Sequence, residues 1–276
     1  MKVNWDCISP GGGQLGRMLA SAASLLDLDV RILEVGDDAP AKQVYAAKGP
    51  PGHIDGSFSD AEKIKELANH VDILTVEIEH VDANVLEEIE SSSNVQVHPS
   101  AQTIRIIQDK FTQKRHFQAH FLPVAQFLPI ESTTESVGRA IAQLGLPLML
   151  KSRTLAYDGR GNFVIHSADQ IKDGLLALAY RPLYAEKWAS FVKEISVMVV
   201  RSTTGQIISY PPVETIHKNN ICHLVFAPLR GASQDVSSRA RKIAEDAVIT
   251  FTGAGVYGVE LFLLENGEGS YTVMWV

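Results

Sequence analysis

The chain has 276 residues, with 25 Lys and Arg against 32 Asp and Glu and a formal net charge of −7, and this length fits one large or two ordinary domains. Hydrophobic residues make up 45% and charged residues 21% of the chain; this globular composition excludes wholesale disorder, and the acidic balance argues against a general nucleic-acid-binding protein. No apolar run reaches the roughly 18 residues of a membrane span, and the two cysteines, Cys7 and Cys222, form no disulfide framework, so we expect a cytoplasmic protein that does not bind membranes.

The first hundred residues alternate strand and helix signals, which predicts an α/β fold with a parallel sheet covered on both faces. In chain order we expect a weak strand at 3–8, a helix at 17–28, a strand at 29–33, a helix at 60–70, a strand at 72–78, a helix at 83–90 and a strand at 95–98. Pro99 and Ser100 then break the pattern. We therefore place a domain boundary near residue 100, with one domain at 1–100 and a second at 101–276.

The second domain opens with one long amphipathic helix from Thr103, whose apolar residues fall on a single stripe that ends at Phe117. Further on we expect strands at 147–152, 163–165, 183–188, 194–201 and 207–210, a helix at 237–251, and strands at 256–264 and 270–276. Asn266-Gly267 is a strong hairpin-turn signal between the last two strands.

A glycine-rich turn, Gly11-x-Gly13-x-x-Gly16, precedes the first helix, and Glu34 ends the following strand. Such a turn lets the backbone approach a phosphate at a helix N-terminus, and an acid near Glu34 would hold a ribose, as in dinucleotide-binding domains. The motif is weak on its own. A tight turn that only packs the helix on the sheet explains the glycines equally well.

Two acidic residues, Glu77 and Glu79, lie at the end of the predicted strand at 72–78 and would share one face of it. Ligands of open α/β sheets bind at the carboxyl ends of strands, so this pair is a candidate binding element. A solvated connection to the next helix is the alternative.

Lys151 ends an apolar strand, and a glycine-containing loop at 156–162 follows it. A lysine in this position provides a point charge for a phosphate, and backbone amides of the loop would cover that phosphate. The loop lacks the spacing of a P-loop. An exposed hairpin turn explains the glycines but leaves the strand-end lysine unexplained.

Other candidates are single acids or histidines near strand ends. Glu186 and Glu194 could serve a base edge and ribose hydroxyls, and Glu260, amid apolar strand residues, could bind Mg²⁺. An exposed strand position is the alternative for each. His217 follows a strand and is a candidate polar group of a pocket. His116 and His120 are four residues apart on a predicted helix, but no further zinc ligands accompany them, so we expect both to be surface residues.

Seven ordered segments resemble the N5-carboxyaminoimidazole ribonucleotide synthetases, ATP-grasp enzymes of purine biosynthesis, and above all the N-terminal part of the bifunctional phosphoribosylaminoimidazole carboxylases of fungi. The segments are GGGQLGRM (11–18), EIEHVD (77–82), TIRIIQDK (103–110), KSRTLAYDGRGN (151–162), AEKW (185–188), ETIHK (214–218) and GVELF (258–262). Their order is far more specific than any single motif. The resemblance implies a Rossmann-like pre-ATP-grasp domain followed by an α+β ATP-grasp domain.

The resemblance also implies roles for individual residues, with ATP, Mg²⁺ and bicarbonate as cofactors and co-substrate and aminoimidazole ribonucleotide as the small-molecule substrate. The substrate would contact Gln14, Leu15 and Glu79, the catalytic loop would provide Tyr157, Asp158 and Arg160, Glu260 would be a Mg²⁺ ligand, and ATP would contact Lys110, Lys151, Gly159, Gly161, Glu186, Lys187, Trp188, Ala189, Glu194 and His217. In this family the glycine-rich turn serves the ribonucleotide, so Glu34 loses its dinucleotide role. A homodimer would suit the family.

The sequence departs from the family after Glu268. The family's Asn-Glu pair would fall at about Thr272 and Val273, and neither residue replaces a metal-binding carboxylate. We therefore expect an ATP-grasp domain that is incomplete at its C-terminal end, as in a truncated or altered chain, with weak MgATP binding and impaired turnover.

Three functions remain open at this point. The first is an ATP-dependent carboxylase of aminoimidazole ribonucleotide, or an inactive fragment of one. The second is an NAD-type oxidoreductase, which rests on the glycine-rich turn alone. The third is a nucleotide-binding protein without catalysis.

Overall fold

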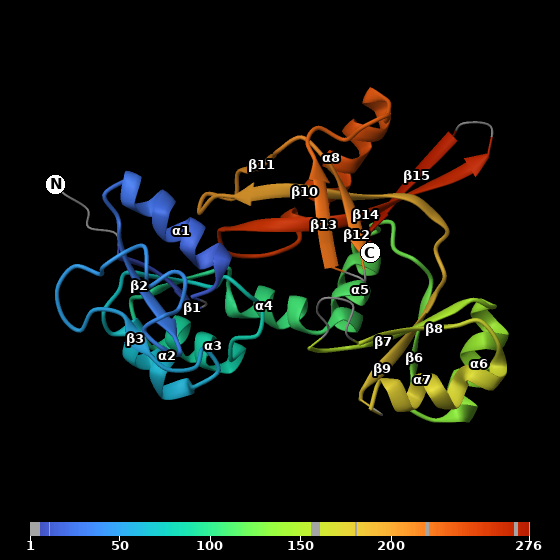
Figure 1. Ribbon diagram of the computed structural model, residues 1–276, viewed down its shortest axis with the longest axis horizontal. Coiled ribbons are helices and arrows are strands. Elements are labelled where there is room, and N and C mark those ends of the chain that lie inside the picture. The colour runs from blue at the N-terminus through green and yellow to red at the C-terminus, as the bar shows by residue number, and fades with distance from the viewer. Residues whose placement is uncertain are drawn as a thin grey trace. The chain divides into compact units, whose positions relative to one another are not determined.

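The computed structural model describes residues 6–10, 12–155, 161–179, 181–218, 221–267 and 270–275 (Figure 1). The chain divides into two compact units, one of Met1–Arg105 with Thr252–Gly255 and one of Ile106–Phe251 with Val256–Val276. Within the described ranges, none of the helices has the length and apolar character needed to cross a membrane.

The first unit is built on a five-stranded parallel sheet with the strand order β3-β2-β1-β4-β5. Its strands are β1 (Asp6–Pro10), β2 (Asp29–Glu34), β3 (Ile54–Asp55), β4 (Ile73–Thr75) and β5 (Gln96–His98). Its helices are α1 (Gln14–Leu25), α2 (Ala61–Ala68), α3 (Ala83–Ser92) and the start of α4 (Ala101–Gln108). This order, which reverses direction at β1, is that of a Rossmann-like sheet and confirms the α/β fold.

Two hydrophobic clusters in this unit hold helices to the sheet. Helix α1 contributes only small residues, Ala20 and Ala23, to a cluster with Val30 and Ile32 of β2. The second cluster is larger and gathers residues of α2, α3, α4 and the strands, among them Leu33, Ile64, Leu67, Leu74, Leu86 and Ile104. The alternation of strands and helices along the sequence thus predicts the layers correctly.

In the first unit, β3 was not predicted, and the strands predicted at 3–8 and 72–78 have other boundaries in the structure. The first strand runs over Asp6–Pro10 and pairs with both β2 and β4, so it is central in the sheet. The predicted strand at 72–78 ends at Thr75, and the following residues form a connection. Glu77 and Glu79 therefore do not share a strand face, although they do lie just beyond the carboxyl end of a strand.

The predicted long helix from Thr103 to Phe117 is wrong, because the structure has two helices there, α4 and α5 (Lys110–Ala119). Asp109 lies between them in an extended conformation, with φ −106° and ψ 101°. Its carboxylate accepts hydrogen bonds from the amides of Phe111 and Thr112, both at 3.0 Å. An aspartate that caps the next helix in this way starts a new helix.

The second unit contains a four-stranded antiparallel sheet with the order β6-β9-β7-β8. Its strands are β6 (Phe127–Ile130), β7 (Leu148–Ser152), β8 (Asn162–Ile165) and β9 (Leu183–Lys187), with helices α6 (Thr134–Leu144) and α7 (Ile171–Ala177) and the short 3-10 helix η1 (Ala168–Gln170). Leu148, Leu150 and Ala185 are fully buried beneath the two helices, against Val137 and Leu175.

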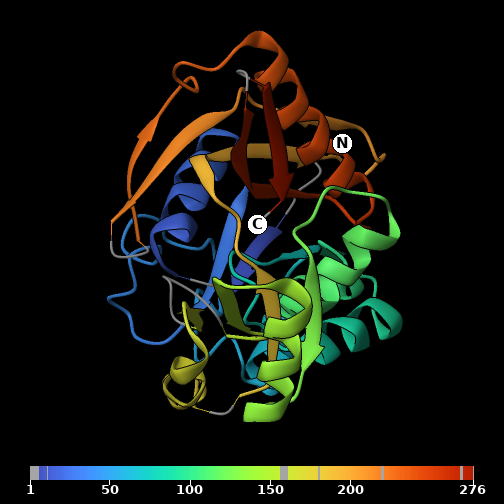
Figure 2. The same ribbon diagram turned by 90° about the vertical axis from the view of Figure 1, so that its right-hand side faces the viewer.

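The other sheet of this unit has the order β13-β12-β10-β14-β15, with β11 paired to β10. Its elements are β10 (Phe191–Arg201), β11 (Ile207–Ser209), β12 (Val213–Lys218), β13 (Ile221–Phe226), β14 (Gly255–Gly267), β15 (Ser270–Trp275) and helix α8 (Gln234–Ile249). Helix α8 packs on one face of this sheet (Figure 2). Buried residues alternate with exposed ones along β14, so the opposite face remains open for polar side chains.

A hydrogen-bonded clasp in the first unit joins the start of α4 to the strip 252–254, which we call the Thr252 clasp. The hydroxyls of Ser100 and Thr252 are 2.6 Å apart, Thr103 Oγ1 donates to the Thr252 carbonyl at 2.9 Å, and the Thr252 amide donates back to Thr103 Oγ1 at 2.9 Å. Thr103 is 1% exposed. The buried hydroxyl of Thr103 is thereby used both as donor and as acceptor in holding this strip.

Candidate functional site

Lys110 and Lys151 are the two lysines expected to bind phosphate. Lys110 begins α5, Lys151 lies near the end of β7, and a hydrogen bond joins these two elements. The amide of Lys110 donates to the carbonyl of Arg153 at 2.7 Å, just beyond β7. Arg153 also forms an ion pair with Asp109, with its Nε 3.0 and 3.2 Å from the two carboxylate oxygens. Asp109 therefore caps α5 and holds Arg153 at the same time, which fixes the start of α5 against the end of β7.

Glu186 lies at the end of β9, between two lysines. Its Oε2 is 2.6 Å from Nζ of Lys114, and its Oε1 is 3.6 Å from Nζ of Lys151. The side chain of Lys114 is fully buried, whereas that of Lys151 is 15% exposed. Although burial alone would raise the pKa of the Glu186 carboxyl, the charges of Lys151 and Lys114 lower it below its ordinary value.

Lys114 makes the stability of the protein depend on pH in the alkaline range. Burial lowers its pKa from 10.5 to about 8, against the opposing attraction of Glu186. Between pH 8 and 10.5 the unfolded chain therefore binds more protons at this site than the folded one, so the free energy of unfolding rises with pH by up to about 1.4 kcal/mol per unit.

We expect urea unfolding at pH 7.5, 8.5 and 9.5 to show this rise in the wild type and not in Lys114→Met. The window stops below the range in which Lys48, Lys63 and Lys65, whose pKa values are raised by carboxylate partners, begin to lower the free energy of unfolding as the pH rises. Parallel curves for the two proteins would contradict the assignment of a depressed pKa to Lys114.

A second group of predicted residues meets on the open face of the larger sheet. His217 of β12 and Glu194 of β10 are in direct contact through Nδ1 and Oε2. Glu260 of β14 is exposed, and its negative charge acts on Glu194. Burial is the main cause of the raised pKa of the Glu194 carboxyl. The charge of Glu260 adds to the rise, whereas His217 opposes it. His217 stands within β12, which corrects the prediction that it follows a strand.

The segment 186–189 runs from the end of β9 into the connection to β10. The amide of Lys187 donates to the carbonyl of Gln126 at 2.8 Å, while its side chain is exposed. Trp188 and Ala189 are half-buried. This end of β9 thus joins the group around Lys151, through Glu186, to the strand that carries Glu194.

The glycine-rich turn of the first unit is occupied by the protein's own carboxylates. Glu34 Oε2 accepts a hydrogen bond from the amide of Gly12 at 2.9 Å, and a Cβ at Gly12 would lie 2.7 Å from the Glu34 side chain. The amides of Gly13, Leu15 and Gly16 at the start of α1 bond to Glu77. Burial raises the pKa of Glu77, and these hydrogen bonds counteract the rise. The amides that a dinucleotide pyrophosphate would need are therefore already engaged.

Of the three residues expected to contact the ribonucleotide, two lie at the helix start that follows this turn. Gln14 and Leu15 begin α1 and are exposed, with 57% of Leu15 accessible, and Glu79 is half-buried in the connection after β4. The predicted loop residues Tyr157, Asp158, Gly159 and Arg160 lie outside the described residues. The description resumes at Gly161, whose carbonyl accepts the amide of Ser152 at 2.7 Å.

The proposed metal ligand Glu260 has no second protein carboxylate at the expected positions. Thr272 and Val273 of β15 pair with Leu264 and Leu263, several residues along β14 from Glu260. Across the described parts of the chain, no group of three His, Cys, Asp or Glu residues could hold a metal by itself. A single carboxylate beside nucleotide phosphates is nevertheless a common arrangement for Mg²⁺, and Glu260 on an open face fits it.

His116 and His120 are only partly as predicted. His120 is exposed, but His116 is half-buried, with its ring stacked on Phe251 at 5.6 Å and its Nε2 2.8 Å from Thr250 Oγ1. The two imidazole rings are 4.4 Å apart. These contacts serve the packing of α5 on the end of α8.

The sequence did not single out Lys114, Asp109 or Arg153. Lys114 lies three residues from both Phe111 and Phe117, and all three are buried. A lysine at a position of the apolar stripe was the signal that could have identified it. Asp109, an N-cap residue type in the middle of a predicted helix, was the signal for the helix break and for the partner of Arg153.

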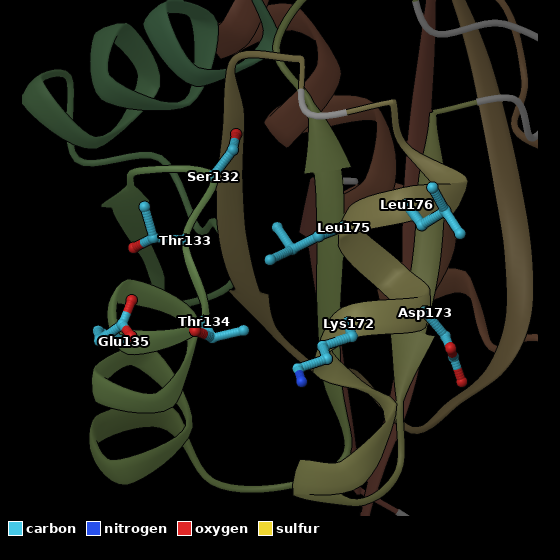
Figure 3. A pocket seen from close by; sticks show the side chains of 8 residues that line it. All are labelled: Ser132, Thr133, Thr134, Glu135, Lys172, Asp173, Leu175 and Leu176. Carbon is cyan, nitrogen blue, oxygen red and sulfur yellow. The ribbon is translucent and has the colours of Figure 1, made fainter.

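An open recess of about 400 Å³ lies elsewhere in this unit, between the start of α6 and α7 (Figure 3). Its lining includes Thr133, Glu135, Lys172 and Leu176. None of the predicted site residues lines it, so its size does not mark the site of the chemistry.

Comparison with known proteins gives matches along nearly the whole chain. The ribonucleotide synthetase preATP-grasp domain family matches residues 10–108, and the ATP-grasp domain family matches residues 115–271. The phosphoribosylaminoimidazole carboxylase of Ogataea methanolica is 53% identical over 258 residues, which are 94% of this chain and 47% of that protein. The chain thus spans about half the length of this curated relative.

Two solved structures from Aspergillus clavatus show the same fold. A carboxyaminoimidazole ribonucleotide synthase complexed with ATP is 45% identical, with a TM-score of 0.91, and the match covers 99% of this chain and 69% of that one. An N5-carboxyaminoimidazole synthase in complex with ADP and 5-aminoimidazole ribonucleotide is 43% identical, with a TM-score of 0.90 and the same coverage.

Proposed function

Because this chain belongs to the N5-carboxyaminoimidazole ribonucleotide synthetase family of ATP-grasp enzymes, we propose that it binds ATP and carboxylates 5-aminoimidazole ribonucleotide with bicarbonate. The observation that carries the proposal is the meeting of predicted residues in the second unit. Lys151 and Glu186 are in contact, Lys110 is tied to the end of β7, and Glu194, His217 and Glu260 share one sheet face.

In this proposal ATP lies along the second unit from the end of β9 to the open sheet face. The segment Glu186–Ala189 binds adenine, Glu194 accepts hydrogen bonds from the ribose hydroxyls beside His217, and Lys110, Lys151 and Gly161 contact the phosphates. The support from the structure is that Glu194 is half-buried and held by His217, while Lys151 is partly accessible. A carboxylate that can accept from ribose hydroxyls and a lysine that can pair with phosphate oxygens are the groups that a nucleoside triphosphate requires.

The ribonucleotide is assigned to Gln14, Leu15 and Glu79, and the reacting centre to Tyr157, Asp158 and Arg160. A bicarbonate oxygen attacks the γ-phosphorus of ATP and ADP leaves, which gives carboxyphosphate. The substrate amine then takes the carboxyl carbon, loses a proton and releases inorganic phosphate. Phosphoryl transfer of this kind depends mostly on the positioning of the reactants and on positive charge near the phosphates, and Lys110 and Lys151 would provide that charge. Mg²⁺ held by Glu260 and the phosphates would neutralise charge on the transferring group.

A melting experiment with ATP and NAD separates the proposal from an oxidoreductase. ATP at a hundredfold excess over its dissociation constant should stabilise the folded chain by about 2.7 kcal/mol, seen as a rise in melting temperature, and NAD at the same concentration should cause no shift. The engaged amides at the glycine-rich turn are the reason for the second expectation. Stabilisation by NAD but not by ATP would overturn the proposal.

Turnover then separates an enzyme from a nucleotide-binding protein. Phosphate release from ATP should require both bicarbonate and aminoimidazole ribonucleotide. A chain that binds ATP and releases no phosphate above the level without substrate would be a binding protein, and the carboxylation part of the proposal would fall.

A further inference from the structure

The carboxylate of Glu186 has two lysine neighbours that are held very differently. The side chain of Lys114 is fully buried, and its Nζ is 2.6 Å from Oε2 of Glu186. The same Nζ lies over the Trp275 ring, 4.8 Å from the ring centroid. Lys151 is 3.6 Å from Oε1, beyond hydrogen-bond distance, and is partly accessible. One cation is therefore close to the carboxylate and fully buried, and the other is farther from it and partly accessible.

A buried carboxylate needs a counter-cation at all times, because an unpaired buried charge costs several kcal/mol. The side chain of Glu186 is only 6% exposed, so water does not take over this role. If Lys151 were its sole partner, contact of Lys151 with a nucleotide phosphate would leave Glu186 unpaired. The attraction of Glu186 would then compete with the phosphate for the same lysine.

We propose that Lys114 is a positioning residue that serves, while it is protonated, as the buried counter-cation of Glu186 and so leaves Lys151 free to bind nucleotide phosphates. This inference rests on the proposed ATP binding by Lys151. Lys114 itself, buried beneath Trp275 and Glu186, does not contact the nucleotide in this arrangement. Its positive charge neutralises Glu186, so that Lys151 can pair with a nucleotide phosphate instead of with Glu186.

The inference predicts an effect on phosphate binding that a merely structural lysine would not have. Replacing Lys114 by methionine keeps the length and apolar stem of the side chain but removes its charge, so Glu186 should capture Lys151. The dissociation constant of adenosine divided by that of ATP reports the contribution of the phosphates alone. A loss of affinity at adenine or ribose affects both ligands equally and cancels in this ratio. We expect this ratio to fall about tenfold or more in Lys114→Met, which is about 1.4 kcal/mol of lost preference.

Two further variants make the test specific. In Lys114→Met/Glu186→Gln the competing carboxylate is absent as well, so the ratio should return to within about threefold of the wild type, as a coupled pair requires. Lys193→Met is the matched control, because Lys193 is one of two cations beside buried Glu214, at 2.9 Å, with Arg230 at 3.0 Å. It should lower stability without changing the ratio.

Calorimetric titrations at pH 7.0 with ATP and adenosine decide between the outcomes. Failure of the wild type to bind ATP would overturn the proposed function and this inference with it. ATP binding by the wild type with an unchanged ratio in Lys114→Met, or a ratio that stays low in the double variant, would overturn the inference alone.

The wild type provides the same test by pH, should Lys114→Met fail to fold. The groups that face Lys114 are Glu186, Lys151 and the uncharged Trp275 ring, and the pKa of Lys114 is about 8. The ratio should therefore fall as the pH rises from 7 to 9.5 in the wild type and remain constant in the double variant. A constant ratio in both would also overturn the inference.

Discussion

Replacing Gly253 by alanine is expected to lower the free energy of unfolding by about 3–5 kcal/mol, a loss large enough to unfold many domains. Gly253 has a φ of +83°, and a Cβ there would lie 2.5 Å from the amide nitrogen of Ser100. Backbone cannot move aside as a side chain does, so the alanine would push the strip away from α4. The hydrogen bonds of the Thr252 clasp, with buried Thr103 at their centre, would be lost together.

Gly52→Ala is the matched control for this effect. Gly52 belongs to the same unit and has nearly the same φ, +81°, but a Cβ there would meet no atom within 4 Å. Its alanine variant carries the cost of the left-handed backbone alone, about 1–2 kcal/mol. Urea unfolding of the three proteins measures both values. Equal losses in the two variants would show that the contact with Ser100 contributes nothing.

Replacing Asp109 by alanine is expected to cost about 2–4 kcal/mol, because one carboxylate serves two structures. It caps α5 through the amides of Phe111 and Thr112, and it pairs with Arg153, whose guanidinium also lies over the Phe111 ring, 5.1 Å from its centroid. Loss of the carboxylate leaves Arg153 without this partner. We also expect weaker ATP binding, since Lys110 is tied to the carbonyl of Arg153.

Two variants separate the cap from the ion pair. Asp109→Asn keeps a good capping residue and removes the charge, so it should lose only the part due to Arg153. Asp60→Ala removes the cap of α2, where the carboxylate accepts the amides of Glu62 and Lys63, and should cost about 1 kcal/mol. A loss in Asp109→Ala no greater than in Asp60→Ala would contradict a stabilising role for the Arg153 pair.

The sequence predicts most elements because their apolar patterns are strong. The alternation over the first hundred residues leads to the parallel sheet, and the buried runs at Leu148–Ser152 and Leu183–Lys187 lead to adjacent strands. The same patterns place Lys151 and Glu186 at strand ends, and the register of β7 against β9 then brings them together. Strand-end position is a local property, so it is readable from one segment.

What the sequence does not show depends on contacts between segments. The meeting of Glu194, His217 and Glu260 requires the strand order β12-β10-β14, which no single strand encodes. Lys114 is polar, and its burial is decided by Glu186, 72 positions away along the chain. The break at Asp109 was missed because a helical stripe of apolar residues continues past it into the second helix.

The Thr252 clasp has a consequence for the order in which the chain folds. Ser100 and Thr252 are 152 positions apart, and nearly all of the second unit lies between them. During synthesis, residues 1–105 emerge from the ribosome long before the strip that completes their unit. Closing so long a loop is entropically costly until the intervening chain is compact. The unit that begins first along the chain is therefore completed only after most of the second unit has been made.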